Sequence, residues 1–398
     1  MLFPSESVDI LKLDFQFEAG SYYQALPLCA SSTITLMPVA TASWDPQQLA
    51  EFVDRKGILI DTNTEQRTVV LTAYLLPRYA TEFFPLLHEM LTAPSFPNEE
   101  VQAHCRRMRQ RLLTNFQRTS YVSRNLFCQA LYGDERPEGR YAVPDDVSAI
   151  TADVLRSHFE QHCRLDQAMR SLAGHYDMAT LDAFRRCFGS PDDAVSTRKA
   201  IFDEPFLQPE STRREIRHSL GLSGPQASIR VGRLLPFGAN DEAYAPFAVL
   251  ATVLGGYFGS RLMRNIREDK GYTYGIYCRT RLHRTSLYFE ILSDVAADCV
   301  DAALTEVYNE MDALCQQPVG DAEMQVVRSY MEGEYLRSID GIFERADRWQ
   351  QLASLGVDEA AFSERLLHAI HHTTAEQLQQ LAQRYLLHDA MTEVVVMG

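Results

Sequence analysis

The chain has 398 residues, 46% of them hydrophobic, which is enough for two or three domains with sizeable cores. Its 38 basic and 53 acidic residues give a net charge of −15, which argues against a nucleic-acid-binding protein. No apolar run approaches the ~18–20 residues of a membrane span. The N-terminus carries no basic region followed by an apolar core, so we expect a cytoplasmic protein, or a periplasmic one if a leader was removed.

The first half predicts an α+β pattern. Apolar and polar residues alternate over residues 8–20, which indicates a strand that ends at Gly20. An amphipathic helix over residues 46–56 ends at Gly57, and two strands are expected within residues 58–75. The remaining expected elements are four helices and a final strand, at residues 82–91, 99–116, 121–131, 152–162 and 169–173.

The second half repeats the first. Three pairs of segments recur about 223 positions apart: 151–155 with 374–378, 100–101 with 323–324, and 168–174 with 390–398, the last with a one-residue slip. The acidic, proline-bearing stretch 201–215 has no periodicity and predicts a linker. We therefore expect two similar halves, residues 1–200 and 216–398, each a sheet backed by helices.

The most informative stretch is Leu254–Ile276, LGGYFGSRLMRNIREDKGYTYGI. Its first part has apolar residues at helical spacing, and its second part is a glycine turn into a strand. Arg267 falls on the last helical turn and Tyr274 on the strand, so both can point at one small volume. Such a pair suits the binding of a peptide carbonyl or a developing oxyanion. In the alternative, Arg267 offsets the helix dipole and Tyr274 is half-buried packing.

This stretch resembles the C-terminal-domain signature of the pitrilysin/insulinase-type zinc peptidases, also called inverzincins. The resemblance extends over nearly the whole chain. It implies two tandem halves, each a mixed, largely antiparallel sheet backed by helices, and a peptide substrate. In that family an Arg and a Tyr at the positions of Arg267 and Tyr274 line the cleft. The family also carries a strand before the one matched at residues 8–20, so the first half has either a shortened sheet edge or an edge covered by a partner.

Catalytic members of this family carry H-x-x-E-H on a helix of the first half. Counting back from Gly57, the motif falls on Ser31-Ser32-Thr33-Ile34-Thr35, and no His, Glu or Asp occurs between Gln24 and Asp45. The third ligand is expected on the helix after Glu99, but no acidic residue occurs between Glu100 and Asp134. We therefore expect no catalytic zinc and no other cofactor in this chain.

Two histidine groups could be mistaken for metal sites. His158 and His162 lie four apart on a helix, but Glu160 faces away from them, and the segment is expected to be an ordinary packing helix. His368, His371 and His372 lie at a helix end, where cations are electrostatically favoured. No metal ligand is assigned to either group.

Six arginines fall in the acid-free segment 101–133: Arg106, Arg107, Arg109, Arg111, Arg118 and Arg124. They predict either a solvated helix face or a docking surface for an acidic partner subunit.

Three functions remain open. The favoured one is a non-catalytic subunit of a heteromeric zinc metallopeptidase, in which Arg267 and Tyr274 act in trans on a homologous HxxEH-bearing partner that holds the zinc. The alternatives are a structural or assembly protein with the peptidase fold, and an autonomous enzyme with a relocated site. No catalysis is expected of the chain alone, and a homodimer of the isolated chain stays open.

Overall fold

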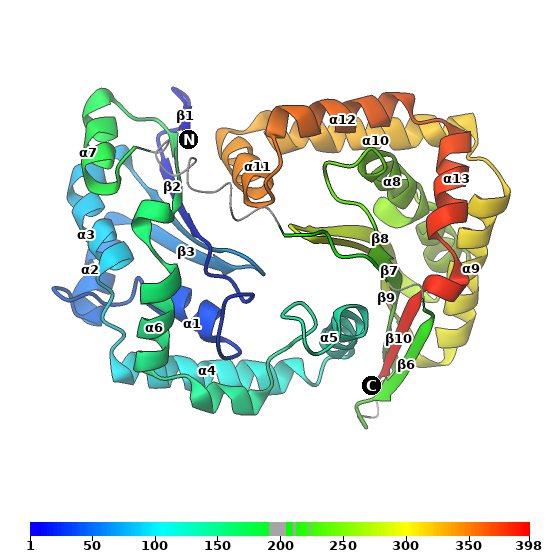
Figure 1. Ribbon diagram of the computed structural model, residues 1–398, viewed down its shortest axis with the longest axis horizontal. Coiled ribbons are helices and arrows are strands. Elements are labelled where there is room, and N and C mark those ends of the chain that lie inside the picture. Colours follow the sequence, from blue (N-terminus) through cyan, green and yellow to red (C-terminus); the bar gives the residue numbers. More distant parts are fainter. Residues whose placement is uncertain (191–203, 210–211, 223) are drawn as a thin grey trace. The chain divides into compact units, whose positions relative to one another are not determined.

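The computed structural model describes residues 1–190, 204–209, 212–222 and 224–398. They form two compact units, each with one five-stranded sheet (Figure 1). Unit 1 contains the described residues of 1–113, 141–203 and 338–351, and unit 2 contains those of 114–140, 204–337 and 352–398. The predicted α+β class with two sheet-and-helix assemblies is confirmed.

Unit 1 has the strand order β1-β5-β2-β4-β3, in which β1 is parallel to β5 and the other pairs are antiparallel. Its strands are β1 (Leu2–Pro4), β2 (Leu11–Phe17), β3 (Leu59–Thr64), β4 (Val69–Leu75) and β5 (Met169–Gly174). Its helices are α1 (Cys29–Leu36), α2 (Pro46–Lys56), α3 (Ala80–Thr92), α4 (Asn98–Asn115), α6 (Ala152–His162), α7 (Met178–Phe188) and α11 (Ile342–Ser354), with the ends of α4 and α11 assigned to unit 2.

Local sequence signals explain several of these boundaries. Helix α2 has the predicted limits because Asp45 caps its first turn, accepting a hydrogen bond from the Gln48 amide at 2.9 Å. Gly57 ends the helix in a left-handed conformation, φ 62°. Strand β2 is buried on both faces, including Lys12 and Asp14, which its alternating pattern does not indicate. Helix α7 was not predicted.

Unit 2 has the strand order β6-β10-β7-β9-β8, with β6 parallel to β10 and the other pairs antiparallel. Its strands are β6 (Arg214–Ser219), β7 (Gln226–Leu235), β8 (Thr273–His283), β9 (Ser286–Ala296) and β10 (Thr392–Met397). Its helices are α5 (Thr119–Tyr132), α8 (Tyr244–Ala251), α9 (Val300–Gln316), α10 (Asp321–Asp340, whose last residues belong to unit 1), α12 (Glu359–His372) and α13 (Ala375–Tyr385).

The internal repeat is visible in the structure. Equivalent elements begin 223 residues apart in four pairs: α4 and α10, α5 and α11, α6 and α13, β5 and β10. The last pair starts at Met169 and Thr392, so the one-residue slip expected there is wrong. Thr151 and Thr374 hold equivalent places, because each caps the helix that follows it. At the sheet edges, β1 has three residues and β6 has six.

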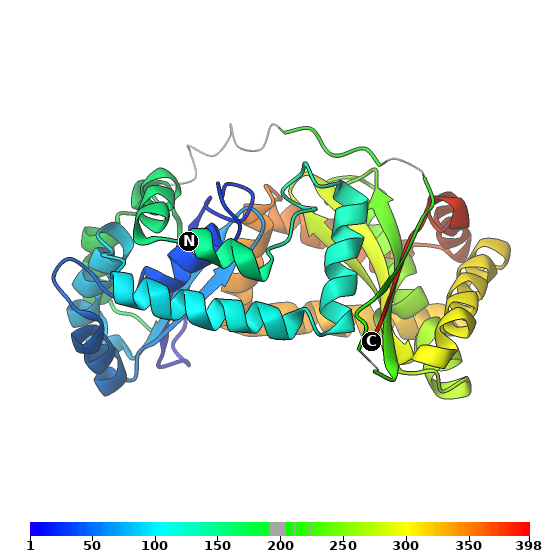
Figure 2. The same cartoon turned by 90° about the horizontal axis from the view of Figure 1, so that it is seen from below.

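The repeats and the compact units differ by two exchanged helices. Helix α5 is encoded in the first repeat but belongs to unit 2, and most of α11 is encoded in the second repeat but belongs to unit 1. Figure 1 shows α5 on one face of the unit 2 sheet and α9 and α13 on the other, and Figure 2 shows α5, in teal, against the strands. Of the predicted linker 201–215, residues 201–203 and 210–211 lie outside the described residues, and β6 begins at Arg214.

In each unit, one face of the sheet packs against helices to form the larger hydrophobic core. In unit 1, Phe15 packs on Phe184 and Phe188 of α7. In unit 2, Phe247 of α8 packs on Phe289 of β9 and Tyr385 of α13. None of the helices in the described part of the chain is long and apolar enough to cross a bilayer.

Candidate functional site

The glycine-rich stretch of unit 2 lies against strand β8 because its glycines allow a close approach. A Cβ on Gly255 would lie 2.6 Å from the backbone nitrogen of Cys278, so only glycine fits there. Two π-helical segments follow, Thr252–Gly256 and Met263–Asp269, and Gly271 then turns the chain into β8 at φ 69°. The predicted helix, turn and strand are all present, although the helical part is wider than an α-helix.

Arg267 lies on the second π-helical segment, which the buried Met263 and Ile266 anchor in the core. Its guanidinium carbon lies 4.4 Å from the centre of the Phe258 ring, a cation–π contact. The guanidinium also lies 3.9 Å from the Glu268 carboxylate, a long ion pair. Phe258 is 61% exposed, an unusual position for a phenylalanine. Its helical spacing with the apolar residues of this stretch predicts a buried side chain, so that expectation is wrong for Phe258.

Tyr274 is 92% exposed at the start of β8, so it is not half-buried packing as the alternative interpretation required. The strand is irregular here, with a register shift between Thr273 and Ile276. Thr273 and Ser293 each donate a hydrogen bond to the Gly275 carbonyl, at 3.0 and 2.9 Å, which holds this irregular segment in place. In the described chain, no hydrogen bond or ring contact joins Tyr274 to Arg267. The structure places both at the surface of one short turn, without direct contact.

Residues of the same stretch line a polar groove of about 480 Å³ that the sequence pattern does not indicate. Its lining consists of polar side chains: Arg261, Arg264, Asn265, Asp269, Lys270, Glu306, Glu310 and Glu323. Arg261 makes a two-pronged ion pair with Glu323, at 2.9 and 3.0 Å. Asn265 donates to Glu306 and Glu310 of α9. These side chains bond to one another, and their bonds hold the π-helical segment against α9 and α10. Its sequence signal is the i, i+4 spacing of the two glutamates on α9.

The predicted zinc-motif positions, Ser31 to Thr35, fall on α1 as expected. There the Oγ of Ser32 lies 3.0 Å from Nε2 of His104 on α4, and both side chains are buried. Burial, together with Arg107 and Arg111, lowers the pKa of His104, which keeps its ring neutral. The segments expected to carry metal ligands are therefore neighbours, but a Ser–His hydrogen bond joins them. Across the described residues, three or more His, Cys, Asp or Glu side chains nowhere group so as to hold a metal ion.

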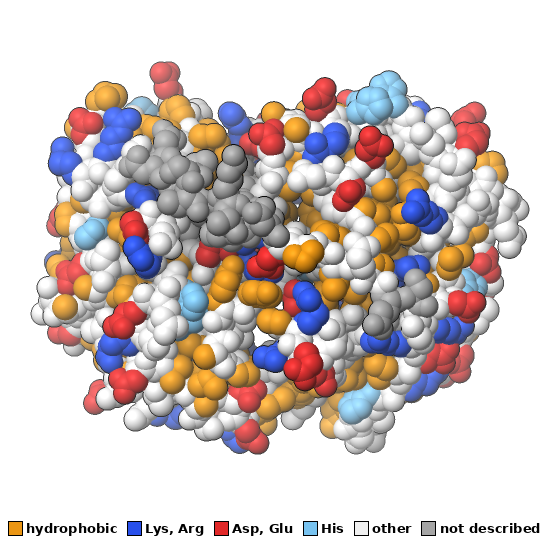
Figure 3. All heavy atoms as spheres, in the orientation of Figure 1, with side chains coloured by type: hydrophobic (Ala, Val, Ile, Leu, Met, Phe, Trp, Pro, Cys, Tyr) orange, Lys and Arg blue, Asp and Glu red, His pale blue; other side chains and the backbone are white. Residues whose placement is uncertain are grey.

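The two histidine groups that could be mistaken for metal sites make ordinary packing contacts. Nε2 of His158 lies 2.9 Å from the Ala19 carbonyl, and its ring packs at 4.9 Å on His162. Burial lowers the pKa of both rings. On α12, the ring centres of His368 and His372 lie 4.6 Å apart with the rings tilted by 47°, and Figure 3 shows histidine side chains gathered on the molecular surface over this helix.

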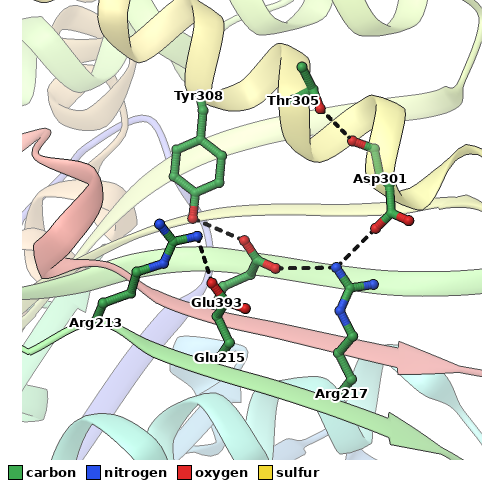
Figure 4. A network of polar contacts seen from close by, with 7 residues as sticks. All are labelled: Arg213, Glu215, Arg217, Asp301, Thr305, Tyr308 and Glu393. Atoms are coloured by element: carbon green, nitrogen blue, oxygen red, sulfur yellow. Dashed lines mark hydrogen bonds and ion pairs between the residues drawn. The ribbon is translucent and has the colours of Figure 1, made fainter.

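A separate polar network holds the edge strand β6 of unit 2 (Figure 4). Arg217 of β6 lies 2.9 Å from Asp301 on α9 and 3.7 Å from Glu393 on β10. Tyr308 of α9 donates to Glu393 at 3.0 Å, and burial and that carboxylate raise the pKa of Tyr308. These bonds join β6, β10 and α9, so the network stabilises the edge of the sheet and not the Arg267 turn.

Comparison with known proteins places the chain among peptidase-fold proteins. Residues 149–331 match the family described as the peptidase M16 inactive domain. The uncharacterized zinc protease YmxG of Bacillus subtilis is 20% identical over 77% of this chain and 73% of its own length. The non-peptidase homolog YmxG of Helicobacter pylori is 24% identical over 60% of this chain and 54% of its own length.

Solved structures share the fold. A peptidase M16 inactive domain from Pseudomonas fluorescens has a TM-score of 0.83 at 18% identity, covering 100% of this chain and 95% of that one. A protease from Helicobacter pylori also has a TM-score of 0.83, at 13% identity, covering 100% and 96% of the two chains.

Proposed function

We propose that this chain, whose residues 149–331 match the peptidase M16 inactive domain, is a non-catalytic subunit of a heteromeric zinc metallopeptidase. It pairs with a homologous subunit that bears HxxEH and the zinc. It contributes half of a peptide-degrading chamber, together with Arg267 and Tyr274 as a clamp on the substrate. This chain binds no catalytic zinc and hydrolyses no peptide alone.

The observation that carries the proposal is the exposure of Tyr274. A tyrosine that is 92% exposed gains almost no packing energy, so packing does not account for its position. The hydrogen bonds of Thr273 and Ser293 hold the strand that carries Tyr274, so they fix the backbone from which its side chain projects. A phenol presented from a fixed backbone is suited to donate to a group outside the chain.

Arg267 supports the same role. Its contact with Phe258 uses the π face of the ring and none of the hydrogen-bond acceptors of the chain, so guanidinium N–H groups stay available to a carbonyl. In the proposed complex Tyr274 donates to the oxyanion that develops on the substrate carbonyl, and Arg267 binds an adjacent carbonyl. The partner's zinc polarises the scissile carbonyl and activates water.

The proposal includes the expectation that this chain holds no catalytic metal. The Ser32–His104 bond lies between the two helices that would otherwise supply ligands, and it is buried and neutral. A hydroxyl and one imidazole are too few and too weak a donor set for Zn²⁺, which takes three or four Cys, His or carboxylate ligands.

The test is steady-state kinetics on the complex with an HxxEH-bearing homologue encoded in the same genome, using a quenched fluorescent peptide. Tyr274→Phe should lower kcat by roughly 10²–10³, because one oxyanion donor is lost. Arg267→Ala should change both kcat and KM, because a carbonyl clamp acts in the ground and transition states.

Tyr277→Phe and Arg279→Ala are matched controls, since both residues are exposed on the same strand, and we expect near wild-type rates. Wild-type rates for Tyr274→Phe and Arg267→Ala in an intact complex would instead support a structural or assembly protein. A monodisperse monomer that ignores the homologue would refute the pairing itself, for which we expect an interface above ~1,000 Å².

A further inference from the structure

Phe258 lies in the turn between the two π-helical segments of unit 2. This turn is held by contacts on both sides of Phe258. Before it, the ring of Tyr257 stacks on Tyr330 of α10, with the ring centres 5.2 Å apart. After it, Ser260 is fully buried and donates its amide hydrogen to the Tyr257 carbonyl at 3.1 Å. Phe258 therefore projects from a backbone that its neighbours hold in place.

The fold gains little from the position of the Phe258 ring. The Arg267 guanidinium covers one face of it, with its carbon 4.4 Å from the ring centre, yet the residue is still 61% exposed. Burial of a phenylalanine is among the larger stabilising contributions of any side chain, and an exposed cation–π contact replaces only part of it. Stability alone therefore does not explain a phenylalanine here, and the uncovered surface of the ring is open to a group outside the chain.

The surroundings of Phe258 favour an apolar side chain over a polar one. The stack of Tyr257 on Tyr330 joins this turn to α10, where Tyr330 and Val326, one turn apart, are also exposed. Exposed aromatic and aliphatic groups beside a single guanidinium are typical of a site that takes an apolar group and orients it with one polar contact. A carbonyl that accepts a hydrogen bond of about 3 Å from Arg267 would bring a neighbouring leucine or phenylalanine side chain within reach of the Phe258 ring.

We propose that Phe258 selects the substrate: it forms an apolar subsite for peptides with an aromatic or large aliphatic side chain next to the carbonyl that Arg267 binds. This inference rests on the proposed function and names its substrate class. Arg267 and Tyr274 act on backbone carbonyls, which all peptides share, so they do not distinguish one peptide from another. The Phe258 ring does, because an apolar side chain leaves water to pack on it, whereas a charged or hydroxylated side chain loses hydration there without gaining a hydrogen bond.

The test is a ratio of rates in the complex with the HxxEH-bearing homologue. Quenched fluorescent peptides that differ only in phenylalanine or serine, at each residue flanking the cleaved bond in turn, give a kcat/KM ratio for each position. At one position we expect a wild-type preference for phenylalanine of at least about tenfold, a ratio near one in Phe258→Ala, and most of the preference kept in Phe258→Leu. Leu387→Ala, which removes a similarly exposed apolar side chain between α13 and β10, is the control and should leave every ratio unchanged.

The ratio separates selection from mere support of Arg267. If Phe258 only positions Arg267, Phe258→Ala slows both peptides by the same factor and every ratio stays as in the wild type, which would overturn the proposal. Hydrolysis of none of the peptides would instead refute the proposed function. Fluorescence anisotropy of the same peptides, labelled, on the chain alone then decides the subsite. Tighter binding of a phenylalanine peptide that Phe258→Ala abolishes would support it, and no binding, or a preference that Phe258→Ala keeps, would overturn it.

Discussion

The two units cover one face of their sheets with an exchanged helix, but they treat buried charge differently. In unit 1, Lys12 and Asp14 on β2 are each 1% exposed, and α11 contributes Asp347, which bonds to Lys12. In unit 2 the ion pair lies within the sheet, between Arg230 of β7 and Glu290 of β9. Helix α5 contributes there the hydroxyl of Ser123, which accepts from Arg230 at 3.1 Å and donates to Ser228 at 3.0 Å.

Buried apolar contacts are more extensive for α5 than for α11. Helix α5 buries Val122, Phe127 and Tyr132 against the unit 2 sheet. From α11, Ala346 is buried in the corresponding cluster of unit 1, with Phe343 and Trp349 only partly covered. The two units therefore hold equivalent helices by different interactions. Helix α5 is held mainly by apolar packing, whereas α11 makes fewer buried apolar contacts and adds the bond between Lys12 and the partly exposed Asp347.

The largest expected effect is that of Lys12→Ala. It leaves the Asp14 carboxylate buried with only the hydroxyls of Thr72 and Ser171 as donors, so unit 1 should lose about 3–5 kcal/mol. Urea unfolding followed by tryptophan fluorescence measures it, because both tryptophans, Trp44 and Trp349, lie in unit 1. Arg156→Ala, which breaks an exposed ion pair with Asp153 in the same unit, is the control and should cost under about 1 kcal/mol. An equally small loss for both variants would show that removing Lys12 does not leave an uncompensated buried charge.

In unit 2, Ser123→Ala should destabilise the contact of α5 by about 1–3 kcal/mol, because it leaves the buried Arg230 Nε without this acceptor. Hydrogen exchange should rise in residues 119–132 and stay unchanged in residues 342–354. Ser120→Ala, on the same helix, is the control. Unchanged exchange in α5 would mean that packing alone holds it.

The pH dependence should also separate the units. The buried histidines of the described chain, His104 and His158, are both in unit 1, and burial lowers the pKa of each. Neutral histidine in the fold contributes stability that is present above the unfolded pKa of about 6.5 and lost as the pH falls through the folded value, by up to about 1.4 kcal/mol per pH unit for each group. Tryptophan-detected stability should therefore fall below pH 6.5, with a smaller slope in His104→Gln. A slope that His104→Gln leaves unchanged would exclude His104 as its source.

The smallest effect is expected for Asp347→Asn. Its side chain is 60% exposed, so solvent screens the charge and the loss should be about 1 kcal/mol or less. The change should still appear locally, as faster hydrogen exchange in α11 with none in α5. Asp340→Asn, exposed at the end of the preceding helix, is the control. If Asp347→Asn leaves hydrogen exchange in α11 unaltered, the bond between Lys12 and Asp347 does not hold that helix in place.

Local signals made most of the fold predictable. A capping aspartate and a terminal glycine define α2, and alternating apolar residues define β2. The exchange of α5 and α11 could not be predicted, because both helices have ordinary local sequences and only long-range packing assigns them to a unit. The same holds for the buried Lys12, whose alternating neighbours indicate an exposed face.

The candidate site was predictable only where a motif carries it. Arg267 and Tyr274 follow from the glycine-rich stretch, and their exposure agrees with a role outside the core. Phe258 and the groove of Arg261 and Glu323 were not found, since their partners lie far away in sequence or look like core residues. The Ser32–His104 bond likewise needs the packing of α1 on α4.

The most direct test of the central claim is zinc content and peptidase activity of the purified chain alone, against the same chain mixed with the HxxEH-bearing homologue. We expect well below one zinc per chain by elemental analysis, no peptide hydrolysis alone, and chelator-sensitive hydrolysis only in the mixture. One tightly bound zinc per chain with chelator-sensitive activity of the chain alone would contradict the account.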